Sequence, residues 1–136
     1  MKTTRSFLTE EQKKVLKLRD EGYTQREIAQ MLGTSRANIS IIEKRARLNL
    51  EKAKATIKEY SILLAPVRVK IKKGMDVINV PKLIFKHADK RGIKVRLNSL
   101  DLIARINAEK KDKIENRIIL EDFEVYIAKN GDVIFA

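Results

Sequence analysis

Side chains that can bind a polyanion are concentrated between residues 24 and 47 of this 136-residue chain. Arginine, serine and small apolar side chains alternate there, as in Arg36, Ala37, Ser40 and Ile41. An arginine can make two hydrogen bonds to guanine, a serine can pair with several bases, and a small apolar group fits against a thymine methyl. These residue types suit the reading of base edges better than the making or breaking of covalent bonds.

The spacing of these residues is helical. Ile39, Ile42 and Ala46 recur at intervals of three and four and are predicted to face inward, which turns the polar set outward. Lysine and arginine beside that set would bind phosphates, which gives affinity without reading sequence. The complete predicted DNA-binding set is Thr24, Gln25, Ser35, Arg36, Ala37, Asn38, Ser40, Ile41, Lys44, Arg45 and Arg47.

Two short helices joined by a tight turn are predicted to position this set. Thr24 and Glu27 form a capping box at the start of the first helix, and Ser35 can cap a second helix that starts at Arg36. Gly33 stands between them, where a sharp turn often needs positive φ. The pattern predicts a helix-turn-helix whose second helix enters the major groove. An ordinary helix pair in a small bundle is the alternative interpretation.

Helices are also predicted on either side of this pair. Thr9 and Gln12 would cap a helix over residues 10–21. After Ile42 no helix breaker appears before Pro66, which predicts one long helix, or two with a bend near Asn49. An apolar stripe along it would be a homodimer seam or a face packed within the same chain, and both remain open. The stripe consists of Ala46, Leu50, Ala53, Ile57, Tyr60 and Leu64.

Composition narrows the function classes. The formal net charge of +12 and the pI of about 10 are typical of a protein that meets a polyanion. There is no cysteine, and the single His87 cannot build a histidine metal site, so no metal and no cofactor are expected. No membrane span or signal peptide is visible, which predicts a cytoplasmic protein without a membrane partner. Carboxylates such as Asp101, Glu121 and Asp122 are scattered and show no catalytic arrangement, so we do not expect an enzyme.

Residues 65–136 are predicted to form a small mixed sheet with helices. Strands are expected at residues 67–71, 93–97 and 118–128, and helices at 81–91 and 100–108, with a short polar helix near Asp112. Asn130 and Gly131 indicate a two-residue hairpin loop that leads into a last strand at 133–135. Charge is uneven, because residues 65–108 carry a net charge of +8 and residues 109–136 a net charge of −2. The basic first strand can be a second phosphate surface or a solvated edge protected by lysines.

The segment FLTEEQKKVLKLRDEGYTQREIAQMLGTSRANISIIEKRA resembles the N-terminal domain of the archaeal Tfx family of DNA-binding transcriptional regulators. It is also similar, more distantly, to region 4 of bacterial sigma factors. The GIKVR segment at residues 92–96 resembles the C-terminal domain of that family. The resemblance implies a promoter-proximal DNA-binding protein with a separate C-terminal module, whose bases are read by Arg36, Ala37, Ser40 and Ile41, with Lys44 beside the backbone.

The sequence thus predicts an α+β protein with two domains. Residues 1–64 would form the helix-turn-helix domain and its long helix, and residues 65–136 an α+β domain for effector binding, dimerisation or partner binding. The predicted function is sequence-specific binding of double-stranded DNA by a transcriptional regulator. A nonspecific architectural DNA-binding protein and an adaptor to RNA polymerase in the transcription machinery are the alternatives.

Overall fold

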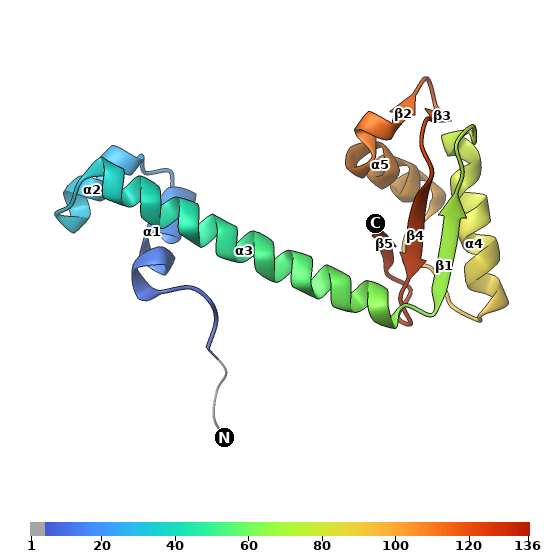
Figure 1. The fold of residues 1–136 in the computed structure, drawn as a ribbon, viewed down its shortest axis with the longest axis horizontal. Coiled ribbons are helices and arrows are strands. Elements are labelled where there is room, and N and C mark those ends of the chain that lie inside the picture. The colour runs from blue at the N-terminus through green and yellow to red at the C-terminus, as the bar shows by residue number, and fades with distance from the viewer. Residues whose placement is uncertain (1–4) are drawn as a thin grey trace. The chain divides into compact units, whose positions relative to one another are not determined.

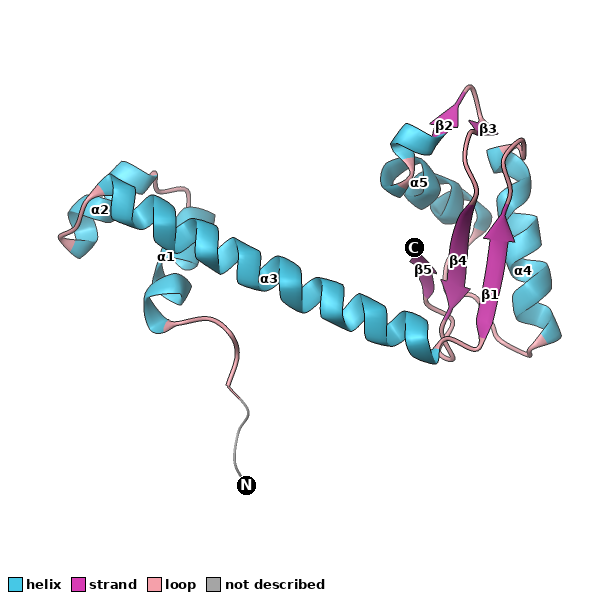
Figure 2. Cartoon of the chain, viewed as in Figure 1, coloured by secondary structure: helices cyan, strands magenta, loops and turns pink. Residues whose placement is uncertain are grey.

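A computed structural model describes residues 5–136 and divides the chain into two units, Met1–Ile57 and Lys58–Ala136. Within the described residues the first unit is entirely helical, and strands occur only in the second (Figures 1 and 2). The predicted α+β class is therefore confirmed. The first predicted domain began at residue 1, and residues 1–4 lie outside the described part of the chain.

Three helices form the first unit: α1 (Glu10–Asp20), α2 (Gln25–Leu32) and α3 (Arg36–Leu64). The predicted capping boxes at the starts of α1 and α2 are both present, so side chains satisfy backbone donors that each helix start leaves free. The core of this unit is small and consists of Val15, Ile28, Ala29 and Ile39, with Leu18, Tyr23 and Ile42 packed against it. It fixes the angle between α2 and α3.

Helix α3 is one uninterrupted helix of 29 residues, about 43 Å long at 1.5 Å per residue. It begins in the first unit, and its last turns belong to the second. There is no break at Asn49, whose side-chain amide donates a hydrogen bond to the backbone oxygen of Phe7 at 3.1 Å. Of the two forms that the sequence allowed, the single long helix is the one observed.

The second unit is built on a three-stranded antiparallel sheet of β1 (Val67–Ile71), β4 (Phe123–Ile127) and β5 (Val133–Phe135), in the order β1-β4-β5. Alternate residues of β1 and β4 are buried, so one face of the sheet forms the core. The predicted mixed sheet is wrong, because every strand pair is antiparallel.

Two helices cover the buried face of this sheet, α4 (Val80–Lys90) and α5 (Ser99–Glu109) (Figure 1). Ile84 and Ala88 of α4 and Leu102 and Ile106 of α5 are fully buried with the inward residues of the strands. Short 3₁₀ turns at Val77–Asn79 and Lys111–Lys113 lead into α4 and out of α5. The short polar helix predicted near Asp112 is thus present, as the 3₁₀ turn Lys111–Lys113.

The strand predicted at residues 93–97 is not formed. Ile93, Val95 and Leu97 are half-buried against the core from an irregular segment, which produces the same alternation that a strand would. Arg96 donates its backbone N–H to the backbone oxygen of Gly131 at 3.0 Å, so the segment crosses the tip of the β4–β5 hairpin instead of running beside a strand.

The predicted hairpin loop has a different length, and a second hairpin was not predicted. The β4–β5 loop has three residues, since Ala128 pairs with Asp132 and Gly131 takes a left-handed φ of 91°. The two-residue loop lies elsewhere, between β2 (Ile114–Glu115) and β3 (Ile118–Ile119), where Asn116 and Arg117 have φ of 50° and 69°. The strand predicted over 118–128 is thus two strands, β3 and β4, and β2 was missed.

Candidate nucleic-acid interface

The turn between α2 and α3 sets the direction in which the start of α3 faces. Gly33 ends α2 with φ 66° and ψ 38°, a left-handed conformation that costs glycine little. Thr34 then donates its backbone N–H to Ala29 at 2.9 Å, which closes the turn. Ile28 and Ile39 meet beneath the turn and are fully buried. The outer side of α3 is thereby turned away from the core.

The structure places most of the predicted base-contacting residues on that outer side. Ser40 is half-buried, and Ile41 is 49% exposed. The other exposed members of the set on α3 are Arg36, Ala37, Asn38, Lys44, Arg45 and Arg47. Ile39 and Ala46 lie on the opposite side with no exposed surface, so the predicted division of this helix into two faces is observed.

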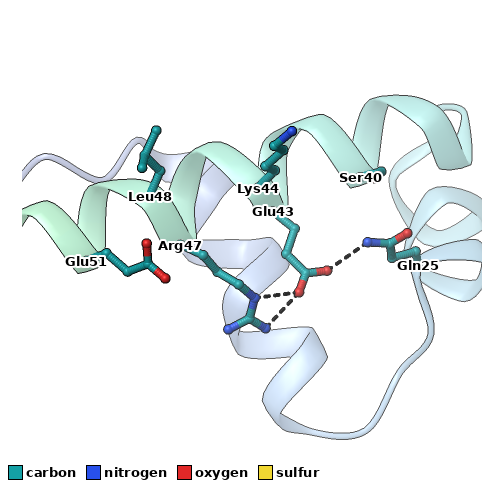
Figure 3. A pocket seen from close by; sticks show the side chains of 7 residues that line it. All are labelled: Gln25, Ser40, Glu43, Lys44, Arg47, Leu48 and Glu51. Atoms are coloured by element: carbon teal, nitrogen blue, oxygen red, sulfur yellow. Dashed lines mark hydrogen bonds and ion pairs between the residues drawn. The ribbon is translucent and has the colours of Figure 1, made fainter. Parts of the chain in front are cut away.

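Glu43 is the one charged residue of α3 that is buried, with 6% of its surface exposed. Its carboxylate oxygen Oε1 accepts a hydrogen bond from Nε2 of Gln25 at 3.0 Å, and its Oε2 accepts from Nε of Arg47 at 2.7 Å (Figure 3). Nε of Arg19 lies 3.0 Å from Oε1 but is not directed well enough for a hydrogen bond. One carboxylate therefore holds α1, α2 and α3 together.

The charges around Glu43 keep it ionised. Burial raises the pKa of the Glu43 carboxyl. The hydrogen bonds from Gln25 and Arg47, together with the positive charges of Arg19 and Arg47, lower it by more, so that the pKa lies below its usual value. The folded state at neutral pH thus contains a buried carboxylate that is fully charged and compensated.

The same contacts constrain two members of the predicted set. The guanidinium of Arg47 is held by Glu43 although its side chain is 55% exposed, and the amide of Gln25 is held through its nitrogen. Beside them lies a hollow of about 430 Å³, lined by Gln25, Ser40, Glu43, Lys44, Arg47, Leu48 and Glu51 (Figure 3). Gln25 and Ser40 reach this hollow from different helices.

A second hollow, of about 500 Å³, lies at the start of α2 and is strongly basic. It is lined by Arg19, Thr24, Gln25, Arg26 and Arg36. Three guanidinium groups therefore surround the end of a helix whose free N–H groups and dipole favour an anion. The arrangement is chemically suited to a phosphate group.

Two predicted contact residues serve as caps. The hydroxyl of Thr24 accepts the backbone N–H of Glu27 at 3.1 Å, and the hydroxyl of Ser35 accepts that of Asn38 at 3.1 Å. Asn38 also donates its side-chain amide to the hydroxyl of Thr34 at 3.0 Å. In return, the side chain of Glu27 accepts the backbone N–H of Thr24, and its hydrogen bonds with Thr24 hold the pKa of that carboxyl below its usual value.

Sequence reasoning missed Glu43, Arg19 and Arg26. The signal for Glu43 was available, because it lies four residues after Ile39 and three before Ala46, on the inward stripe of an otherwise basic segment. A carboxylate at such a position requires cationic partners. Arg19 and Arg26 had no comparable signal, since their approach to Arg36 depends on how α1, α2 and α3 are packed.

Other kinds of site are not found in the described part of the chain. No group of three or more His, Asp or Glu side chains between residues 5 and 136 is placed to hold a metal ion. None of the helices described there combines the length and the apolar character that a membrane crossing requires.

Comparison with known protein families agrees with this geometry. Residues 6–52 match the family described as "Sigma-70, region 4", and residues 53–135 match the family described as "DNA-binding protein, TFX, C-term". The chain belongs to the Tfx family. This family consists of DNA-binding proteins and not of enzymes, so the predicted family and the absence of enzymatic function are both confirmed.

Relatives match this chain over nearly its whole length. A protein of Methanocaldococcus jannaschii, provisionally named a transcriptional regulatory protein, is 53% identical over 94% of this chain and 93% of its own length. The DNA-binding protein Tfx of Methanothermobacter marburgensis is 35% identical over 96% of this chain and 94% of its own. A provisionally named transcriptional regulatory protein of Pyrococcus furiosus is 43% identical over 90% and 85%.

Proposed function

We propose that this Tfx-family protein is a transcriptional regulator that binds double-stranded DNA in a sequence-specific manner, with the N-terminal turns of α3 in the major groove. The observation that carries the proposal is the two-sided character of α3. Ile39 and Ala46 are fully buried, while Arg36 and Lys44 are exposed on the other side of the same turns. A recognition helix needs this arrangement, because its reading side has to meet base edges without obstruction.

The proposal is also supported by cationic side chains on α3 that are available to bind DNA. Among the described residues, no carboxylate lies within 4 Å of the charged nitrogens of Arg36, Lys44 or Arg45. An arginine without an internal partner can bind guanine through both of its terminal nitrogens. We assign base contacts to Arg36, Ala37, Ser40 and Ile41, and phosphate contacts to Lys44 and Arg45.

The basic hollow at the start of α2 would anchor the DNA backbone. Gln25 and Arg26 are the first two residues of that helix, where backbone N–H groups are left free, and the side chains of Arg26 and Arg36 supply positive charge. A phosphate seated there would fix the register of α3 in the groove. Arg47, which is bound to Glu43, would act mainly by positioning Gln25 and Glu43, and a direct phosphate contact would come second.

We further propose that residues 1–64 form the DNA-binding domain and residues 65–136 a module for effector binding, partner binding or dimerisation. The apolar stripe of α3 supports a homodimer. Ile57 is 67% exposed, Tyr60 61% and Leu64 54%, and they continue the heptad-like spacing of residues 46, 50 and 53. Light scattering on the full chain should give twice the monomer mass, and a Tyr60→Lys variant should give one monomer mass.

Footprinting on genomic fragments tests the central proposal. A sequence-specific regulator should protect defined sites that survive an excess of random competitor DNA, with a preference of about 10³-fold or more. If protection disperses as competitor is added, and specific and random duplexes bind within about tenfold of each other, the protein is an architectural DNA-binding protein instead.

An adaptor to RNA polymerase is the second candidate, because residues 6–52 match a domain of sigma factors. That role would require a protein contact that persists without DNA. A pull-down with polymerase in nuclease-treated extract separates the two functions. Retention of polymerase by an Arg36→Ala variant that no longer distinguishes DNA sequences would favour the adaptor.

A further inference from the structure

Helix α4 carries three lysines along its exposed side, Lys82, Lys86 and Lys90, which we call the lysine ridge. They are spaced four residues apart and therefore lie one above the other, about 6 Å apart along the helix. The opposite side of α4 is buried through Val80, Ile84 and Ala88. The ridge is thus presented outward by a helix whose orientation is fixed by the core.

The ridge opposes the stability of the helix that carries it. Like charges at i and i+4 each destabilise a helix by a few tenths of a kcal/mol. Lys82 also lies in the first turn, where the helix dipole is positive and no acidic residue is present. Only Lys90, in the last turn, is favoured by the dipole. Stability of α4 therefore does not explain the pattern.

Within the part of the chain that the structure describes, no carboxylate partner offsets these charges. Among the described residues, no carboxylate lies within 4 Å of the amines of the ridge, although Asp89 is on the same helix. A ridge whose charges cost stability and find no partner among residues 5–136 indicates a function in binding.

The surroundings of the ridge are basic as well. Residues 65–108 carry eleven Lys or Arg against three Asp or Glu, and one of those three, Asp76, is held by Arg117 at 2.6 Å. Helix α4 packs against β1, and Arg91 ties the end of α4 to the start of β1 through the backbone oxygen of Pro66 at 2.9 Å. The ridge therefore lies on a helix fixed to β1, within the part of the chain that carries the largest excess of positive charge.

Charge is unevenly distributed within this unit, which argues against lysines that serve only to keep the protein soluble. Residues 109–136 carry a net charge of −2, and Glu124 lies opposite Lys70 in the sheet and 3.8 Å from Arg68. The outward residues of β1 are thus partly neutralised by β4, while the lysine ridge is not.

We propose that the lysine ridge is a second phosphate-binding surface, which contacts the backbone of duplex DNA and reads no bases. The partner follows from charge complementarity. Lysines act on phosphates as point charges, and three at regular spacing can reach successive phosphates along one strand. This inference rests on the proposed function, because it adds a backbone contact to a protein already inferred to bind DNA.

The test is the salt dependence of binding to a random-sequence duplex by the full chain. Each lost phosphate contact lowers the slope of log K against log salt by about 0.9, so replacing all three ridge lysines with glutamine should lower the slope by about 2 to 3. The matched control replaces Lys111, Lys113 and Lys129, exposed or half-buried lysines outside α4, with glutamine. The control variant loses the same charge, and its slope of log K against log salt should differ from the parent's by less than about 1.

This design distinguishes a loss of DNA binding from a loss of folding. Glutamine has a helix propensity similar to that of lysine, and loss of like-charge repulsion should leave the thermal midpoint of the ridge variant no lower than the parent's. Equal slopes for ridge and control variants overturn the ridge proposal. If the two variants have equal salt slopes and the parent still distinguishes its target from random DNA, the ridge proposal fails and the proposed function stands. If the parent binds no duplex at low salt, both proposals fail.

Discussion

Nε2 of Gln25, the first residue of α2, donates a hydrogen bond across 3.0 Å to the buried carboxylate of Glu43 in α3. This contact joins the start of α2, which lines the basic hollow, to α3, the helix proposed to read bases. Because the carboxylate is also paired with Arg19 of α1, one charged group joins all three helices of the first unit. The apolar core of the first unit is small, and the Glu43 network lies beside it.

Replacement of Glu43 by glutamine should destabilise the first unit by about 1 to 2 kcal/mol. The change removes the negative charge that pairs with Arg19 and Arg47, and a hydrogen bond to a charged group contributes about 1.5 to 3 kcal/mol. The loss is smaller than for a fully buried pair, because the side chains of Arg19 and Arg47 are 35% and 55% exposed. Glu51→Gln is the matched control, since it neutralises an exposed carboxylate two turns further along the same helix and should change stability by less than about 0.5 kcal/mol. Urea unfolding monitored by circular dichroism measures both. Equal midpoints for the two variants would show that the network is incidental.

The stability contributed by Glu43 should depend on pH in a defined direction. Its folded pKa lies below the unfolded value of about 4.3, so its contribution is complete above that value and is lost as pH falls through the folded pKa. The difference in unfolding free energy between the parent and Glu43→Gln should therefore be constant from about pH 6 to 8 and shrink below about pH 4. Urea unfolding of both proteins across this range provides the measurement, and a difference that grows on acidification would contradict the assignment.

Arg36 and Lys44 should differ in the way their loss affects DNA binding. Arg36→Ala should cost about 1 to 3 kcal/mol on the cognate site and much less on random duplexes, because a bidentate base contact is lost. Lys44→Ala should weaken binding to all sequences alike and reduce the salt slope by about 1. Titrations of both variants on both duplexes, at two salt concentrations, compare them directly. Parallel losses for the two variants on every duplex would remove Arg36 from the base-reading set.

Local sequence signals were sufficient to predict the helix-turn-helix, but they did not predict the hydrogen-bond and ion-pair network around Glu43. The hydroxyls of Thr24 and Ser35 and the glycine at position 33 act within three or four residues of chain, and all three behave as their positions predict. The Glu43 network joins residues that are 18 and 24 positions apart, so its partners are set by packing. Nothing near Arg19 in the sequence indicates that it would face a carboxylate on α3.

Errors in the second unit have a similar cause. Residues 93–97 alternate like a strand, but alternation reports only which side chains reach the core, and an irregular segment satisfies it equally well. Asn130 and Gly131 did mark a hairpin, yet the loop length was decided by the pairing of Ala128 with Asp132. Conversely, Arg117 adopts a left-handed φ that its residue type disfavours, so the loop between β2 and β3 could not be predicted from composition.

A side chain at Gly131 should be destabilising because of a steric clash, and Gly74 provides a control without that clash. A Cβ at Gly131 would lie 2.0 Å from the backbone oxygen of Lys94, whereas a Cβ at Gly74 would meet nothing within 4 Å. The two glycines have nearly the same φ, 91° and 93°, so the strain of placing alanine in a left-handed conformation, about 1 kcal/mol, is common to both. Gly131→Ala should therefore cost about 1 to 3 kcal/mol more than Gly74→Ala, because the hairpin tip and the segment at residues 93–97 have to separate. Thermal unfolding of the two variants gives the difference, and equal losses would mean that residues 93–97 do not press against the hairpin in solution.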